Sequence, residues 1–170
     1  MQKKPSKNLF NAKTGREVTK LVGSWEPSGV RSNMDGAGIY VGLGYSNYYI
    51  PSEVSSYEIH DDNSLTVTSK DDFGVAFDFI LEQGVTYVLS YDYDSVCGVN
   101  VLFYDETGAF IKTGGASNSV PFVVPENAYF TVVNFLHYRS QTNGVPATTT
   151  FTNIQIEKGT AATEFEPFKK

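Results

Sequence analysis

The chain has 170 residues, of which 19% are charged and 41% are hydrophobic, and its formal net charge is −6. These values fit a single globular domain with a sizeable core, and they exclude the compositions of disordered and membrane-embedded chains. The lysines and arginines form no basic stripe, so the composition also argues against sequence-independent binding of nucleic acid. A neutral or a cationic ligand suits this charge better.

The first seven residues are polar, and no apolar stretch follows their charges. This beginning predicts neither a signal peptide nor a transmembrane segment, and its composition is that of a linker. We therefore expect a polar arm at residues 1–7 and a single module at residues 8–170, which belongs to a larger parent protein.

Further along the chain, β-branched and aromatic residues alternate with polar ones, a pattern typical of strands. Short strands are expected at residues 18–22 and 39–41, beside or within a glycine-rich loop region at residues 23–51. Regular strands then follow at residues 64–69, 73–81, 85–94, 99–105, 109–112, 121–125, 128–138 and 148–156. No apolar stripe of helical period exceeds about two turns. The sequence thus predicts an all-β jelly-roll β-sandwich of two antiparallel sheets with little helix.

Two of these strands have faces of unequal polarity. In residues 85–94, Asp92 alternates with the tyrosines and lies on the opposite face from them. Near the end of residues 128–138, polar and aromatic groups gather at Asn134, His137, Tyr138 and Arg139. Sugar recognition uses such a mixture, in which a flat ring contacts the C–H face and amides, carboxylates or guanidinium groups bond the hydroxyls.

The long loop region holds the single tryptophan and three tyrosines, and long loops inside compact domains are often functional. The candidate ligand contacts are therefore Trp25, Tyr45, Tyr48, Tyr49, Asp92, Asn134, His137, Tyr138 and Arg139. For each of them an ordinary structural role is the alternative. The tyrosines would then lie at the edge of the core, and Trp25 would plug one end of the sandwich.

Support for catalysis is thin. His60 and His137 have no metal-binding spacing, and no nucleophile elbow, phosphate loop or zinc motif occurs. The single Cys97 excludes an intrachain disulfide and a thiolate zinc cage. The acidic pairs at residues 61–62 and 71–72 lie in expected turns, where solvated side chains are a simpler interpretation than a glycosidase pair. We expect no enzyme activity and no cofactor.

Calcium is the one metal that a jelly roll of this kind could hold, through carboxylates and backbone carbonyls. Glu157, beside the last strand, and Asp105 are the residues that could contribute. No calcium-loop spacing accompanies them, so a metal-free domain is the preferred expectation.

The two ends of the chain carry a family signal. The expected module opens with Asn8-Leu9-Phe10-Asn11. Residues 153–159, at the end of the last expected strand and just after it, read Asn-Ile-Gln-Ile-Glu-Lys-Gly, with Thr-Ala-Ala-Thr-Glu-Phe-Glu-Pro after them. Between them lie Gly-Val-Thr-Tyr-Val-Leu-Ser at 84–90, Tyr-Asp-Glu-Thr-Gly at 104–108 and Val-Val-Pro-Glu-Asn-Ala at 123–128. In this order and spacing, the motifs resemble those of jelly-roll carbohydrate-binding modules of phage tail and baseplate proteins.

The resemblance implies a module of an enlarged ("evolved") distal tail protein, or of a receptor-binding or tail-fibre subunit, in a long-tailed phage of Gram-positive hosts. The implied ligand is a host cell-wall polysaccharide, and the implied place of action is the tail tip at the bacterial surface. Other tail or baseplate proteins would be partners through the parent chain. The matching motifs are structural, so Gln155 and Glu157 are expected to serve the scaffold, and no binding residue is transferred.

Two other functions stay open on the sequence. One is a structural or oligomerisation module of a tail fibre or baseplate. The other is a glycan-cleaving domain, which would need two carboxylates that converge in a cleft. Neither nucleic acid nor a membrane is expected as a partner.

Overall fold

The computed structural model describes residues 39–41, 55–62, 64–70, 73–106, 110–114 and 118–167, and at positions 39–41, 55, 73, 74, 76–78 and 139 it describes the backbone alone. These residues form strands and one short helix. In chain order they are β1 (Ile39–Val41), β2 (Ser55–Ile59), β3 (Leu65–Ser69), β4 (Phe73–Phe79), β5 (Thr86–Tyr93), β6 (Gly98–Tyr104), β7 (Phe110–Thr113), β8 (Pro121–Val123), β9 (Phe130–Leu136), α1 (Arg139–Thr142) and β10 (Ala147–Lys158).

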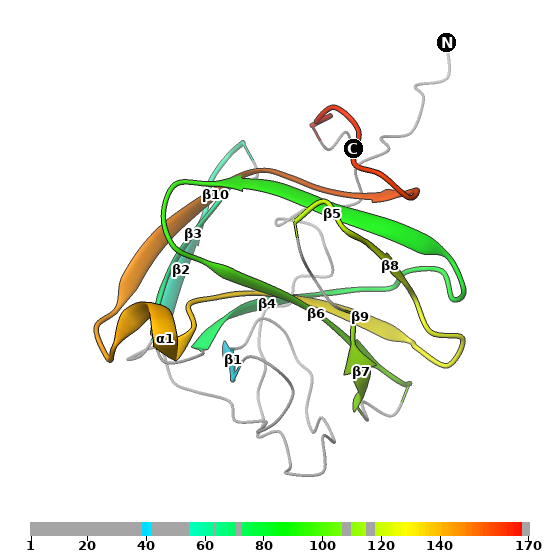
Figure 1. Ribbon diagram of the computed structural model, residues 1–170, viewed down its shortest axis with the longest axis horizontal. Helices are drawn as coiled ribbons and strands as arrows, with labels where there is room; N and C mark the ends of the chain where they lie inside the picture. The colour runs from blue at the N-terminus through cyan, green and yellow to red at the C-terminus, as the bar shows by residue number, and fades with distance from the viewer. Residues whose placement is uncertain are drawn as a thin grey trace.

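The strands make two antiparallel sheets that pack face to face (Figure 1). The upper sheet of Figure 1 has the order β2-β3-β10-β5-β8, and the lower sheet has the order β1-β4-β9-β6-β7. From β3 to β10 these orders are those of a jelly roll, in which two Greek keys are folded together. Strands β1 and β2 extend the sheets beside β4 and β3. The predicted all-β jelly-roll sandwich is therefore confirmed.

The core lies between the sheets, because alternate residues of each strand point inward. In β5 the inward residues Tyr87, Leu89 and Tyr91 are all buried. The rings of Phe135 in β9 and Phe151 in β10 meet edge to face at 4.9 Å, which joins the centres of the two sheets. An aromatic pair of this kind adds about 0.5–1.5 kcal/mol beyond the burial of its area.

The outward face predicted for residues 85–94 is as expected, since Ser90 and Asp92 point away from the core. For residues 128–138 the alternation did not decide between the two faces, and the structure turns Val133 and Phe135 into the core. Strand β2 was not predicted. It is a five-residue edge strand in which Tyr57 and Ile59 alternate with one polar residue, a pattern too short to indicate a strand, and its pairing with β3 holds it in place. The strand expected at residues 18–22 and the arm at residues 1–7 lie outside the described residues.

Helix α1 lies in the connection between β9 and β10. Within the part of the chain that the structure describes, no helix has the length and apolar character needed to cross a membrane.

Candidate functional site

A β-bulge in β10 shapes the outer face of the upper sheet. Thr152 is the register partner of Asp92, and pairing with β5 resumes only at Gln155 opposite Ser90. In the bulge Asn153 has φ 50°, a left-handed conformation that asparagine tolerates better than most residues. Its side-chain Nδ2 donates to Oδ2 of Asp92 at 2.7 Å, so the bulge holds an amide and a carboxylate together.

After β10, residues 159–167 fold back over the outer face of the upper sheet, and we call this segment the strap (Figure 1). Thr163 donates its backbone N–H and its hydroxyl to the two carboxylate oxygens of Glu157, each at 2.7 Å. The backbone N–H of Glu166 donates to Oε1 of Gln155 at 2.9 Å. Gln155 and Glu157 are buried beneath these contacts, which confirms the scaffold role expected for them.

The strap contacts bear on the calcium expectation, because both carboxylate oxygens of Glu157 already accept hydrogen bonds. Asp105 lies at the end of β6 and lines a different surface hollow. Among the described residues, no group of three or more acidic, histidine or cysteine side chains is placed to hold a metal ion. A metal-free domain stays the expectation for this chain.

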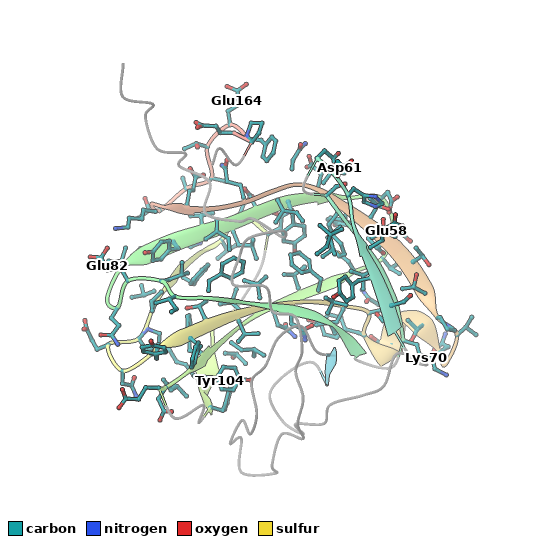
Figure 2. All side chains as sticks on the ribbon, turned by 180° about the vertical axis from the view of Figure 1, so that it is seen from behind. Glu58, Asp61, Lys70, Glu82, Tyr104 and Glu164 are labelled. Carbon is teal, nitrogen blue, oxygen red and sulfur yellow. The ribbon has the colours of Figure 1, made fainter. Side chains whose placement is uncertain are left out.

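Between the strap and the upper sheet lies a hollow of about 260 Å³, which we call the Asp92 hollow. It is somewhat smaller than the roughly 300–1,000 Å³ typical of small-molecule pockets. Figure 2 shows the strap, with Glu164 labelled, above the sheet. The lining residues come from β5, from the segment before β8, from the bulge of β10 and from the strap: Ser90, Tyr91, Asp92, Asn118, Ser119, Asn153, Ala162, Thr163 and Phe165.

Asn118 makes one wall of the hollow by pairing with the edge of β5. Its Oδ1 accepts the backbone N–H of Tyr91 at 3.1 Å, and its Nδ2 donates to the Tyr91 carbonyl at 2.7 Å. The backbone N–H of Ser119 donates to the Leu89 carbonyl at 2.9 Å, which continues the pairing that β8 makes with β5. The amide therefore replaces a strand neighbour, and this wall is fixed by the sheet itself.

The Asp92 hollow combines polar hydrogen-bonding groups with an aromatic ring. Asp92 and Asn153 are exposed, and the Phe165 ring on the strap is 37% exposed. A carboxylate supplies acceptors, amides and hydroxyls supply both donors and acceptors, and a ring supplies an apolar surface. Such a set matches an uncharged, hydroxyl-rich ring that has one apolar face.

The structure does not bring the residues predicted from the sequence into one place. Asp92 lines the hollow, and Trp25, Tyr45, Tyr48 and Tyr49 lie outside the described residues. Arg139 begins α1, and only its backbone is described.

Asn134 and Tyr138 lie on the other side of the sandwich, on the outer face of the lower sheet. Asn134 pairs in register with Asn100 of β6, and the Tyr138 hydroxyl donates to Oδ1 of Asn100 at 3.1 Å. The Tyr138 ring covers Gly98 so closely that a Cβ there would lie 2.4 Å from a ring carbon. Asn134 is fully buried, and in the described part of the chain its amide nitrogen and oxygen have no hydrogen-bond partner.

His137 lies inside the sandwich and is fully buried. Its Nδ1 is 2.6 Å from the Ser69 hydroxyl of β3, and its Nε2 is 2.8 Å from the Thr149 hydroxyl of β10. Burial lowers the pKa of this imidazole, which keeps it neutral. In this position it holds strands together, and we leave it out of the proposed site.

Cys97 and Tyr91 show no sign of nucleophilic chemistry. Burial raises the pKa of the Cys97 thiol to about 11 and also raises the pKa of the Tyr91 hydroxyl. Both groups therefore stay protonated near neutral pH, and a protonated thiol is a poor nucleophile.

Sequence reasoning missed Asn118, Asn153 and Phe165. Asn153 and Phe165 belong to the terminal motif, which was interpreted as purely structural. For Asn118 no local signal exists, because its partner Tyr91 lies 27 positions away in the chain.

No protein-family model matches the sequence, and neither does any curated protein. Among solved structures, a chain of accessory secretory proteins 1, 2 and 3 from Streptococcus pneumoniae is similar with a TM-score of 0.51 at 15% identity. The match covers 72% of this chain and 95% of that chain. At this identity the similarity shows the fold alone.

Two further structures score lower. A chain of the glycosylation-associated Gap123 complex from Streptococcus agalactiae has a TM-score of 0.47 at 11% identity, over 73% of this chain and 45% of that chain. A CBM4 structure has a TM-score of 0.40 at 15% identity, over 72% of this chain and 86% of that chain. These two scores are too low to support an argument about function, so the comparisons establish a β-sandwich and no family.

Proposed function

We propose that this chain is a non-catalytic carbohydrate-binding module of a phage tail protein, and that it recognises a host cell-wall polysaccharide. The observation that carries the binding proposal is the Asp92 hollow, where a bonded carboxylate and amide, Asp92 and Asn153, lie beside Asn118 and an exposed ring. The phage tail and the wall polysaccharide rest on the sequence motifs at the two ends of the chain.

The mechanism is recognition by directional hydrogen bonds and one apolar contact. The sugar hydroxyls bond to Asp92 and to the amides, and Phe165 covers the C–H face of the ring. A site this small and open binds weakly. Many copies on one tail tip would raise the apparent affinity by roughly 10²–10⁴ without a new contact.

The presence of one carboxylate among the described lining residues of the Asp92 hollow supports binding over hydrolysis. Glycosidases use two carboxyl groups on opposite sides of the bond that is cleaved. Asp92 is the carboxylate among the residues that line the hollow, and it is already bonded to Asn153. No observation in the described part of the chain favours a cleaving site there.

The test is labelling of whole host cells with the fluorescently tagged chain, together with a glycan array that includes wall polysaccharides. We expect the unsubstituted chain to label the cells and the Asp92→Ala variant to lose most of that labelling. Glu58→Gln is the matched control, since Glu58 is an exposed carboxylate on the edge strand β2 outside the hollow. Absence of labelling and of any array signal would contradict the proposal, and so would release of reducing sugar from the wall material.

A further inference from the structure

A second hollow, of about 350 Å³, lies at the end of the sandwich where the β4–β5 and β8–β9 turns meet, and we call it the loop-end hollow. Here the turn between β4 and β5, the segment after β6 and the turn between β8 and β9 come together, at the right of Figure 1. The lining residues are Gln83, Asp105, Glu106, Asn127 and Tyr129. Its volume lies within the range of small-molecule pockets, and it is distinct from the Asp92 hollow on the sheet face.

Tyr129 supplies a braced aromatic surface in this hollow. Its backbone N–H donates to the Tyr104 carbonyl at 2.8 Å, which ties it to β6. Its ring packs against that of Phe130 with centroids 4.6 Å apart and planes at 78°, and the residue is still 44% exposed. An aromatic ring held from one side and open on the other is suited to stacking with a ligand.

The hydrogen-bonding groups around Tyr129 are mostly acceptors. Gln83 donates its Nε2 to the Ala128 carbonyl at 2.7 Å. Because a carbonyl can only accept, this bond fixes the orientation of the amide, and the acceptor Oε1 and the second N–H of Nε2 remain. Asp105 and Glu106 add carboxylates, and the lining residues include no lysine, arginine or histidine.

The two hollows therefore call for different ligands. The Asp92 hollow has one carboxylate among its lining residues, Asp92, and Asn118, Asn153 and the hydroxyls there provide donors as well as acceptors. At the loop end, two carboxylates and a fixed amide oxygen stand beside an aromatic ring. The complement of that set is a group with several N–H donors and a positive charge, since such a cation is attracted both by the carboxylates and by the ring.

We propose that the loop-end hollow is a second saccharide site, selective for a sugar that carries a protonated amine. This inference rests on the proposed carbohydrate binding and specifies the substrate class at a separate place. A wall polysaccharide with free amino groups would then be bound at both hollows, its neutral rings on the sheet face and its amino sugars at the loop end.

The experiment compares a glucosamine oligomer with an N-acetylglucosamine oligomer of the same length, by calorimetric titration of the full chain in about 0.15 M salt. At about pH 6 we expect the free amine form to bind roughly tenfold more tightly, in line with a cation over a ring and a carboxylate contact. Raising the pH to about 9.5 deprotonates the amine and leaves the carboxylates charged, so the preference should disappear.

Variants assign the preference to the hollow. Glu106→Gln and Tyr129→Ala should each reduce it severalfold, and Tyr129→Phe should keep it because the ring remains. Glu58→Gln removes the same charge at the opposite end of the molecule (Figure 2, where Glu58 and Glu82 mark the two ends) and should leave the preference intact. If Glu58→Gln lowers it as much as Glu106→Gln, the attraction is a general effect of net charge, and the proposal is wrong.

Equal binding of the two oligomers by the unsubstituted chain would also overturn the proposal. That result would leave the first function standing as long as Asp92→Ala still abolished labelling of cells. Loss of cell labelling by Asp92→Ala with an intact amine preference would conversely support both sites.

Discussion

The hydroxyl of Ser69 and Nδ1 of His137, 2.6 Å apart, connect β3 of the upper sheet to the end of β9 in the lower sheet. The Thr149 hydroxyl donates to the Val96 carbonyl, so its oxygen accepts the proton on Nε2 of His137. Nδ1 is then the unprotonated nitrogen and accepts from Ser69. The imidazole is therefore neutral and oriented from both sides.

This arrangement predicts that the fold loses stability in mild acid. Burial lowers the pKa of His137 in the folded chain below its ordinary value of 6.5, so the unfolded chain takes up the proton more readily. The contribution of neutral His137 to the free energy of unfolding is fully present above about pH 6.5, and it is lost as the pH falls through the folded-state pKa. Urea unfolding at about pH 7.5 and pH 5 should show a lower midpoint in acid. In His137→Gln the difference should shrink, and an unchanged difference would refute the role of this residue.

The strap depends on Glu157. Replacement by Gln retains the shape but turns one of the two acceptors of Thr163 into a donor, so we expect a loss of about 1–3 kcal/mol in the free energy of unfolding. Hydrogen exchange at the Thr163 amide should become faster. The neighbouring Lys158→Gln, which breaks an exposed ion pair with Glu82, should cost much less. Equal losses in the two variants would contradict a buried anchor.

Asn134 is expected to be replaceable by an apolar residue of similar shape. Its side chain is fully buried, and its two amide atoms have no partner in the described part of the chain. Asn134→Leu removes these unsatisfied groups and keeps the branched shape at a somewhat larger volume, so the free energy of unfolding should change by no more than about 1 kcal/mol. Thermal unfolding measures this. A large loss would mean that the amide has a partner in solution.

Substitutions of Asn153 can distinguish an effect on stability from an effect on binding. Glycine adopts positive φ without strain, so Asn153→Gly should keep the bulge and change stability by less than about 1 kcal/mol. It removes the amide that donates to Asp92, and binding of wall polysaccharide should weaken roughly fivefold or more. Asn153→Ala lacks the amide and also strains the backbone at this positive φ, so it should lose both stability and polysaccharide binding. Undiminished binding in Asn153→Gly would exclude the Asp92 hollow as the ligand site.

The candidate site was only partly predictable from the sequence. The alternation of tyrosines with Ser90 and Asp92 in β5 placed Asp92 on an outer sheet face, because strand side chains alternate with a period of two. The same rule put Asn134 and His137 on opposite faces of their strand. It could not tell which of these faces is inward, nor that the outer face of β9 and that of β5 lie on opposite sides of the sandwich. That distinction depends on which sheet each strand joins.

The sequence by itself determined the jelly-roll sandwich and the polar outer face of β5, since these follow from local alternation and local turns. The structural role of Gln155 and Glu157 was indicated by the resemblance of the terminal motif. Only the tertiary structure determined which residues come together to line the two hollows. Asn153 and Asp92 are 61 positions apart, and Asn118 and Tyr91 are 27 apart. Their contacts arise from the bulge in β10 and from the register between strands, and no local pattern in the chain encodes a register between segments so far apart.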